Sequence, residues 1–126
     1  MLPRDIYNCE IFSIPIGICN TKKTFKYNKE DLPLGKGFFW VLKVLDGKYK
    51  HTEITDYFFL EYNPLCPKKK DIDYTRLKDV LNALNMKKFK SNDLEQFIGQ
   101  KIQVLINTKL NQNEEPVNYV EKYVSC

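Results

Sequence analysis

The sequence predicts a mainly β domain with helices, arranged as a five-stranded barrel, with residues 1–126 forming a single domain. Three observations predict it. Apolar and polar residues alternate in several segments, an Asp-Gly turn separates two of these segments, and a helical pattern stands between the third and fourth strands. The length suits one domain, and a hydrophobic fraction of 43% can supply a core.

The first two strands are predicted on either side of a long loop. Residues 5–18 alternate with the period of a half-buried strand. Its apolar side is expected to carry Tyr7, Cys9 and Ile11. Residues 20–37 are polar and rich in lysine, which predicts a long loop with room for a short strand, and such loops are often functional. Residues 38–45 form the second strand, which is apolar over most of its length.

Asp46-Gly47 is the strongest short hairpin signal, and it joins the second strand to a third at residues 48–62. Two registers are open at this turn. A two-residue turn sets Trp40 opposite Glu53 and favours an outward-facing indole. A turn with a bulge sets Trp40 opposite Ile54 and makes it part of the core.

The helices and the last two strands follow. Asp71 or Asp73 is the predicted cap of the first helix, which ends near Asn85-Met86. Its apolar side is Ile72, Leu77, Val80, Leu81 and Leu84. A second, shorter helix is predicted in residues 91–99, capped by Asn92 with Glu95 reaching back and ended by Gly99, with Leu94, Phe97 and Ile98 on its apolar side. The fourth and fifth strands are residues 100–108 and 117–124.

This order, β-β-β-α-β-β, is that of the OB-fold, a small five-stranded Greek-key barrel. In such a barrel the helix between the third and fourth strands closes one end. The main alternative is an open α+β sheet with the helices on one face.

Composition limits the partners and the location of the protein. The net charge is +4, which permits a polyanionic partner without requiring one. Since no apolar run approaches the roughly 20 residues of a membrane span, and the N-terminus lacks the pattern of a signal peptide, we expect a cytoplasmic protein without a membrane partner. The cysteines Cys9, Cys19, Cys66 and Cys126 are scattered, so we expect thiols in a reducing compartment, and neither a metal nor another cofactor.

Catalytic motifs are absent from the sequence. "LGKG" at residues 34–37 has two glycines but lacks the strand-loop-helix context of a phosphate loop, so it is interpreted as a flexible entrance to the second strand. His51 is the only histidine and is expected to be a solvated or half-buried strand residue, not a catalytic base. We therefore do not expect an enzyme.

Lysines alternate with aromatic residues in the pattern expected of a protein that binds single-stranded nucleic acid. Lysines neutralise phosphates, and rings stack on bases whatever the base sequence. An OB-fold binds with its second and third strands and with the loops that follow its first and fourth strands. The candidates lie mainly at these places, with a further basic run after the third strand: Lys22, Lys23, Phe25, Lys26, Tyr27, Phe39, Trp40, Lys43, Lys48, Tyr49, Lys50, Tyr57, Lys68, Lys69, Lys70 and Lys109. The best stacking candidates are Phe39, Trp40, Tyr49 and Tyr57.

The chain resembles a family of small phage-encoded single-stranded DNA-binding proteins with an OB-fold. The matching segments are, in order, "IYNCEI", "VLKVLDGKYKHTEITDYFFL", "TRLKDVLNALNM", "LEQFIGQKIQVLI" and "VNYVEKYV". Asn85 replaces the usual glycine after the helix, which Asn can do because it also accepts left-handed geometry. His51 stands where a small residue is common. The segment "YVEKYVSC" is not an acidic tail, which puts recruitment of partners by such a tail in doubt.

The resemblance implies protection of single-stranded DNA during phage replication or recombination, without chemistry, and replication or recombination proteins as further partners. We therefore predict a largely sequence-independent single-stranded DNA-binding protein. The first alternative is an OB-fold adaptor or inhibitor that binds a host or replication protein instead of DNA. The second is an accessory protein of a metal-dependent nuclease.

Overall fold

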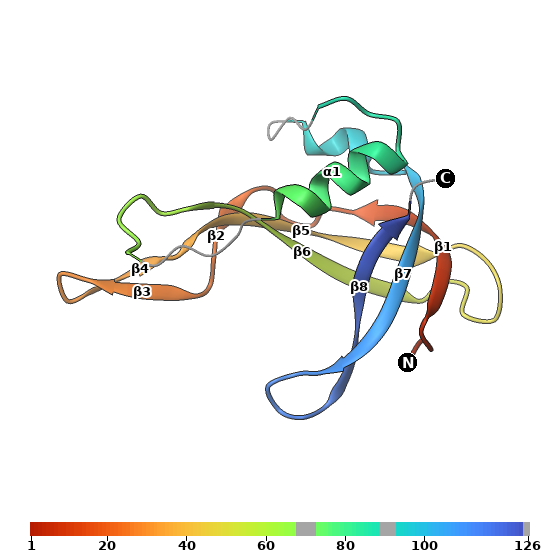
Figure 1. The fold of residues 1–126 in the computed structure, drawn as a ribbon, viewed down its shortest axis with the longest axis horizontal. Helices are drawn as coiled ribbons and strands as arrows, with labels where there is room; N and C mark the ends of the chain where they lie inside the picture. The colour runs from red at the N-terminus through yellow and green to blue at the C-terminus, as the bar shows by residue number, and fades with distance from the viewer. Residues whose placement is uncertain (68–72, 89–92, 125–126) are drawn as a thin grey trace.

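The computed structural model of this protein describes residues 1–67, 73–88 and 93–124, and it is mainly β (Figure 1). The strands are β1 (Asp5–Ser13), β2 (Cys19–Asn20), β3 (Thr24–Tyr27), β4 (Glu30–Pro33), β5 (Gly35–Val44), β6 (Glu53–Tyr62), β7 (Lys101–Leu110) and β8 (Pro116–Val124). The helices are α1 (Tyr74–Ala83) and a single 3-10 turn, η1 (Leu94–Phe97).

The prediction of a mainly β fold is confirmed, and all strand pairs are antiparallel. β5 pairs with β6 along one edge and with β2 and β1 along successive parts of the other. β1 also pairs with β7, and β7 pairs with β8. In the part of the chain that the structure describes, no ladder joins β6 to β8, so the strand pairing does not close into a ring at this seam.

The long loop predicted between the first two strands is instead mostly a β-hairpin. β3 and β4 pair with each other and project away from the main sheet (Figure 1). Asn28 and Lys29 form the two-residue turn, with φ of 48° and 67°. Positive φ at both central residues is the geometry of a type I′ hairpin turn, which matches the twist of the flanking strands. We call residues 22–33 the arm.

Both registers predicted at Asp46-Gly47 are wrong. Trp40 pairs with Asp56, because residues 45–52 form a loop longer than either predicted turn. The loop is fixed by hydrogen bonds from Val44 N to Thr52 O (2.9 Å) and from His51 N to Val44 O (2.8 Å). His51 therefore lies in the loop, exposed and with a φ of 75°, and not in a strand. The observed register differs by two residues from the bulged one, so Trp40 points to the same side and is buried.

The first predicted helix is confirmed over residues 74–83. Leu77, Val80 and Leu81 are buried. Asn85 takes the left-handed conformation after the helix, with a φ of 57°. Met86 N then bonds to Leu81 O (2.8 Å), which completes a Schellman-type end. The Asp71 and Ile72 predictions lie outside the described residues.

The second predicted helix is only the 3-10 turn η1. Leu94 and Phe97 are buried as predicted, but Ile98 is 44% exposed and not part of an apolar side. Asp93 precedes this turn without a capping hydrogen bond from its side chain, and the Asn92 prediction lies outside the described residues. Gly99, with a φ of 89°, ends the segment.

The core lies between the inner face of the sheet, α1 and η1. A cluster of rings fills its centre: Phe38, Trp40, Phe58, Phe97 and Tyr123. The core also takes Cys9 and Ile11 of β1, which confirms the alternation predicted for the first strand. Across the described ranges, no helix is long and apolar enough to cross a membrane.

Candidate nucleic-acid interface

β5 and β6 together present two different faces. One face is buried in the core through Phe38, Trp40 and Phe58. Alternation along the strands then turns the neighbouring residues outward. We call this outward side the outer face; it carries Phe39, Val41, Lys43, Thr55, Tyr57 and Phe59.

Three aromatic rings lie together on the outer face. Phe39 and Tyr57 are directly opposite each other in the β5–β6 ladder, and Phe59 is the next outward residue of β6. Tyr57 is 43% exposed, while Phe39 and Phe59 are half-buried. The ring of Phe59 makes an edge contact with Tyr62 at a centroid distance of 4.7 Å. A row of partly exposed rings on a sheet offers the apolar planes on which bases stack.

The outer face continues onto β1 through Phe12, which sequence reasoning missed. Phe12 is 43% exposed, and the ammonium Nζ of Lys43 lies 3.9 Å from the centroid of its ring. Lys43 also stands opposite Glu10 on one side and Glu53 on the other. These carboxylates offset the charge of Lys43. This end of the outer face therefore offers an exposed ring to a ligand but little net positive charge.

The arm carries most of the lysines near the outer face. Lys22, Lys23 and Lys26 are exposed, Tyr27 is 40% exposed and Phe25 is half-buried. Lys26 Nζ lies 2.9 Å from Asp31 Oδ1 on the paired strand, and both side chains are largely exposed. Such surface pairs are weak, so Lys26 can exchange Asp31 for a phosphate at small cost. β4 leads directly into β5, which sets the arm beside the end of the outer face that holds Phe59.

Two of the predicted stacking rings are structural residues. Trp40 is fully buried, and its indole Nε1 donates a hydrogen bond to the Tyr123 hydroxyl, so the prediction that it stacks on a base is wrong. Tyr49 is half-buried, packs edge-on against Tyr7 at 6.2 Å and against the core, and lies in the loop of residues 45–52, so it is not one of the rings of the outer face.

The lysines of the hairpin loop do not join the arm. Lys48 and Lys50 are exposed in the loop of residues 45–52, at the other end of the β5–β6 pair from the arm (Figure 1). Lys48 Nζ lies 5.6 Å from the ring centroid of Tyr49. The predictions for Lys68, Lys69 and Lys70 lie outside the described residues.

Lys109 reaches the edge of the outer face across the open seam between β6 and β8. A groove of about 430 Å³ lies there, lined by Thr55, Asp56, Tyr57, Arg76, Lys109, Asn118, Tyr119 and Val120. Lys109 Nζ stands 5.0 Å from the ring centroid of Tyr119. The structure thus brings Lys109 near Tyr57, although Lys109 lies within β7 and not in the turn where it was predicted.

A polar network closes the inner end of this seam. Asp56 Oδ2 accepts hydrogen bonds from the Tyr123 hydroxyl (2.5 Å) and from the Arg76 guanidinium. Burial works against the charge of Arg76, but the hydrogen bond and charge of Asp56 outweigh it, so the pKa of Arg76 is raised. Burial, followed by the charge of Asp56, raises the pKa of Tyr123 well above its ordinary value.

The start of α1 blocks the free edge of β6. The Arg76 guanidinium donates to Tyr57 O (3.1 Å), and Asp73 exchanges two hydrogen bonds with the backbone of Phe59. Asp73 is therefore a partner of β6 and not a side-chain cap of its own helix, because its carboxylate accepts from Phe59 N. An edge strand covered in this way is protected from pairing with another chain.

Sequence reasoning missed several residues of this surface: Phe12, Phe59, Arg76 and Tyr119. Phe12 follows Ile11, which was expected on the apolar side of the first strand, so strict alternation could have found it; Phe59 follows the buried Phe58 in the same way. Arg76 and Tyr119 join the site only through contacts between distant segments, for which the sequence carries no local signal.

Neither family models nor curated proteins nor solved structures gave a match when the chain was compared with them.

Proposed function

We propose that this protein binds single-stranded DNA, largely independently of base sequence and without catalysis. The observation that carries the proposal is the outer face, where Phe39 and Tyr57 pair directly, Phe59 and Phe12 extend the row of rings, and the lysines of the arm stand beside it. Rings that stack on bases and lysines that neutralise phosphates are together what such a ligand needs.

We further propose that the fold is an OB-fold barrel. Support comes from the strand order β6-β5-β1-β7-β8, which is that of an OB-fold opened between its third and fifth strands. The outer face then corresponds to the usual binding face, with the arm in the loop after the first strand and Lys109 near the loop after the fourth. The role that follows from the sequence resemblance is protection of single-stranded DNA in phage replication or recombination, in contact with the proteins of those processes.

A titration of fluorescently labelled oligo-dT followed by anisotropy at two salt concentrations tests the proposal. We expect binding at low salt that weakens steeply as salt rises, because phosphate contacts release counterions. Anisotropy is the better signal, since Trp40 is buried and need not report binding on the outer face. The Phe39→Ala variant should bind about 5-fold to 100-fold more weakly, the effect of losing one stacked base. Absence of binding at low salt would refute the proposal and favour a protein partner.

A further inference from the structure

Two glycines of β5 lie beneath the rings of the outer face. A Cβ added to Gly37 would overlap the hydroxyl oxygen of Tyr57 and lie 2.8 Å from its Cζ atom. A Cβ added to Gly35 would overlap the carbonyl oxygen of Glu61 and lie 2.8 Å from Cζ of Phe59. The tips of both rings, together with backbone carbonyl oxygens of β6, therefore occupy the space that side chains at residues 35 and 37 would fill.

Strand geometry explains the position of these rings. Side chains on a strand usually stand roughly perpendicular to the sheet. Tyr57 is paired with Phe39, and Gly37 is its diagonal neighbour on β5; Phe59 is paired with Gly37, and Gly35 is its diagonal neighbour. Because the diagonal positions carry no side chains, both rings lean in the same direction along the strand pair and lie over the β5 backbone.

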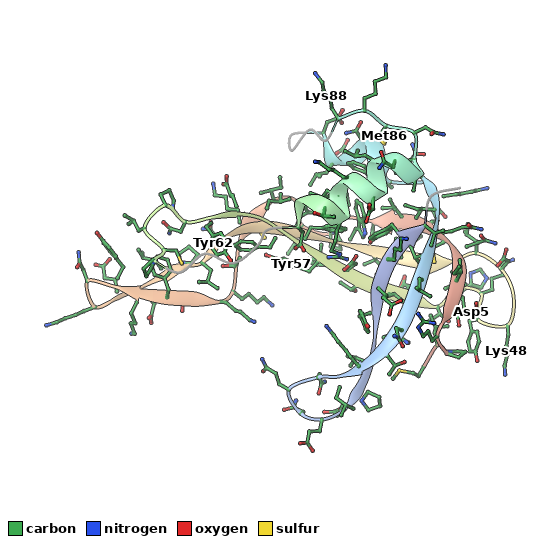
Figure 2. The ribbon with its side chains drawn as sticks, in the orientation of Figure 1. Asp5, Lys48, Tyr57, Tyr62, Met86 and Lys88 are labelled. Atoms are coloured by element: carbon green, nitrogen blue, oxygen red, sulfur yellow. The ribbon has the colours of Figure 1, made fainter. Side chains whose placement is uncertain are left out.

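A leaning ring has one side against the sheet and the other toward solvent. Tyr57 keeps 43% of its surface exposed in this position. Figure 2 labels Tyr57 and Tyr62 on β6, on the stretch that runs from beneath α1 toward the arm. A base stacks best on a ring face that is free and fixed. A ring that lies over a glycine meets this need better than a ring that stands upright against a neighbouring side chain.

The backbone beneath the same two rings is fixed from the other edge. Arg76 Nη1 donates to Tyr57 O, and Asp73 N donates to Phe59 O at 2.9 Å. The backbone that carries the rings is therefore fixed before any ligand arrives. Such preorganisation reduces the entropy lost on binding.

We propose that Gly37 and Gly35 are positioning residues of the interface, which lay Tyr57 and Phe59 over β5 as two seats for bases of the bound strand. The inference rests on the proposed function, since it assigns these seats to the same DNA strand. It also gives "LGKG" a role that the sequence interpretation, a flexible entrance to the strand, did not include.

Cys19 supplies a reporter of the Tyr57 seat that needs no DNA. Cys19 pairs with Gly37, so its side chain lies on the side of β5 where the Tyr57 hydroxyl stands. Burial raises the pKa of Tyr57, and Cys19 adds to the shift, which is consistent with their proximity. The ring of Tyr57 should therefore shield the half-buried thiol of Cys19.

A double-mutant cycle of Gly37→Ala and Tyr57→Ala, read by oligo-dT affinity, tests the proposal. We expect each single variant to weaken binding by about 5-fold to 100-fold, and the double variant to be little weaker than Tyr57→Ala alone, because the glycine acts through the ring. Gly17→Ala is the matched control, since a Cβ there meets nothing within 4 Å, and it should leave affinity unchanged. Additive losses in the cycle would overturn the proposal.

The Cβ of Gly37→Ala also meets the carbonyl oxygen of Phe58, so this variant can fail to fold. In that case, alkylation of Cys19 in the free protein, followed by mass spectrometry, tests whether the ring of Tyr57 lies over Gly37. Tyr57→Ala should speed alkylation relative to the native protein, and Tyr57→Phe should do so far less, because its ring still covers Gly37. An unchanged alkylation rate in Tyr57→Ala would show that the ring of Tyr57 does not lie over Gly37 and Cys19, and would overturn the proposal. Faster alkylation with unchanged oligo-dT affinity would confirm the position of the ring but refute its role in binding DNA.

Discussion

Trp40 and Tyr123 lie 83 residues apart in the sequence, and the indole Nε1 of Trp40 donates a 2.9 Å hydrogen bond to the hydroxyl of Tyr123. That hydroxyl donates in turn to Asp56, which also binds Arg76. The chain of contacts links β5, β8, β6 and α1 at the seam that strand pairing leaves open. Side chains therefore hold β6 near β8 where backbone hydrogen bonds do not.

Removing the Tyr123 hydroxyl should destabilise the protein. Tyr123→Phe leaves the buried Nε1 of Trp40 without its acceptor and deprives Asp56 of one donor. A buried polar group left unsatisfied costs about 1–3 kcal/mol, which should appear as a lower urea midpoint. Tyr27→Phe, a change to an exposed ring of the arm, is the control and should keep the native midpoint. Equal midpoints for the two variants would show that the hydrogen bond contributes nothing.

Alkaline pH should unfold the protein partly through Tyr123. Its pKa is raised in the folded state by burial and by Asp56. Above about pH 10 the unfolded chain loses the Tyr123 proton while the folded chain keeps it, so the free energy of unfolding falls as pH rises. Urea midpoints measured between pH 8 and pH 11 should fall less steeply for Tyr123→Phe than for the native protein. Tyr7, Tyr57 and Cys9 have shifts of the same sign, so the native slope exceeds that of one group.

Arg76 should matter more for stability than Arg4, although each forms an ion pair. Arg76 contacts Asp56, Tyr57 O and the ring of Phe58, whereas Arg4 pairs with Glu121 alone among the described residues and its side chain is 60% exposed. Lysine cannot reproduce the planar fork of arginine, so Arg76→Lys should cost about 1–3 kcal/mol. Arg4→Lys should change stability by less than about 1 kcal/mol. Thermal melts of both variants check this, and comparable losses would contradict the structural difference.

The sequence predicted the strands well because they are half-buried, and alternation is the direct record of that burial. β1 and β7 follow it, β5 alternates in burial although its sequence is apolar over most of its length, and the buried residues of α1 follow the helical spacing instead. The arm was missed because its turn is Asn28-Lys29, where the usual glycine is replaced by residues that still adopt positive φ.

The candidate site was only half predictable, because it depends on one register. Asp46-Gly47 lies in a loop of eight residues, and Lys43, not Asp46, ends the ladder with β6. The pairing of Phe39 with Tyr57 and the burial of Trp40 follow from that register. The contacts of Tyr57 with Gly37 and of Arg76 with β6 join distant segments, so composition and spacing could not reveal them.

The cysteines should differ sharply in reactivity. Burial raises the pKa of the Cys9 thiol to about 12, so the thiolate that reacts with iodoacetamide is almost absent at pH 8. Cys19 is half-buried on the outer-face side of β5 and should react first of the two. Bound oligo-dT should then slow the alkylation of Cys19 by covering Tyr57, and leave that of Cys9 unchanged. Mass spectrometry of peptides from native and DNA-bound protein checks both expectations, and equal rates at Cys19 with and without saturating DNA would contradict the proposed binding surface.

The lysines of the arm should set the salt dependence of the proposed DNA binding. Lys22, Lys23 and Lys26 are exposed, and they belong to the arm and not to the strands that carry the outer-face rings. Each lysine that contacts a phosphate contributes about 0.7 to the slope of log affinity against log salt concentration for a single strand. Replacing all three by alanine should therefore reduce the slope by up to about 2, while stacking on Phe39 and Tyr57 persists at high salt. Lys78→Ala, at an exposed position of α1, is the matched control and should keep the native slope. An unchanged slope in the triple variant would place the phosphates away from the arm, on other cations such as Lys109.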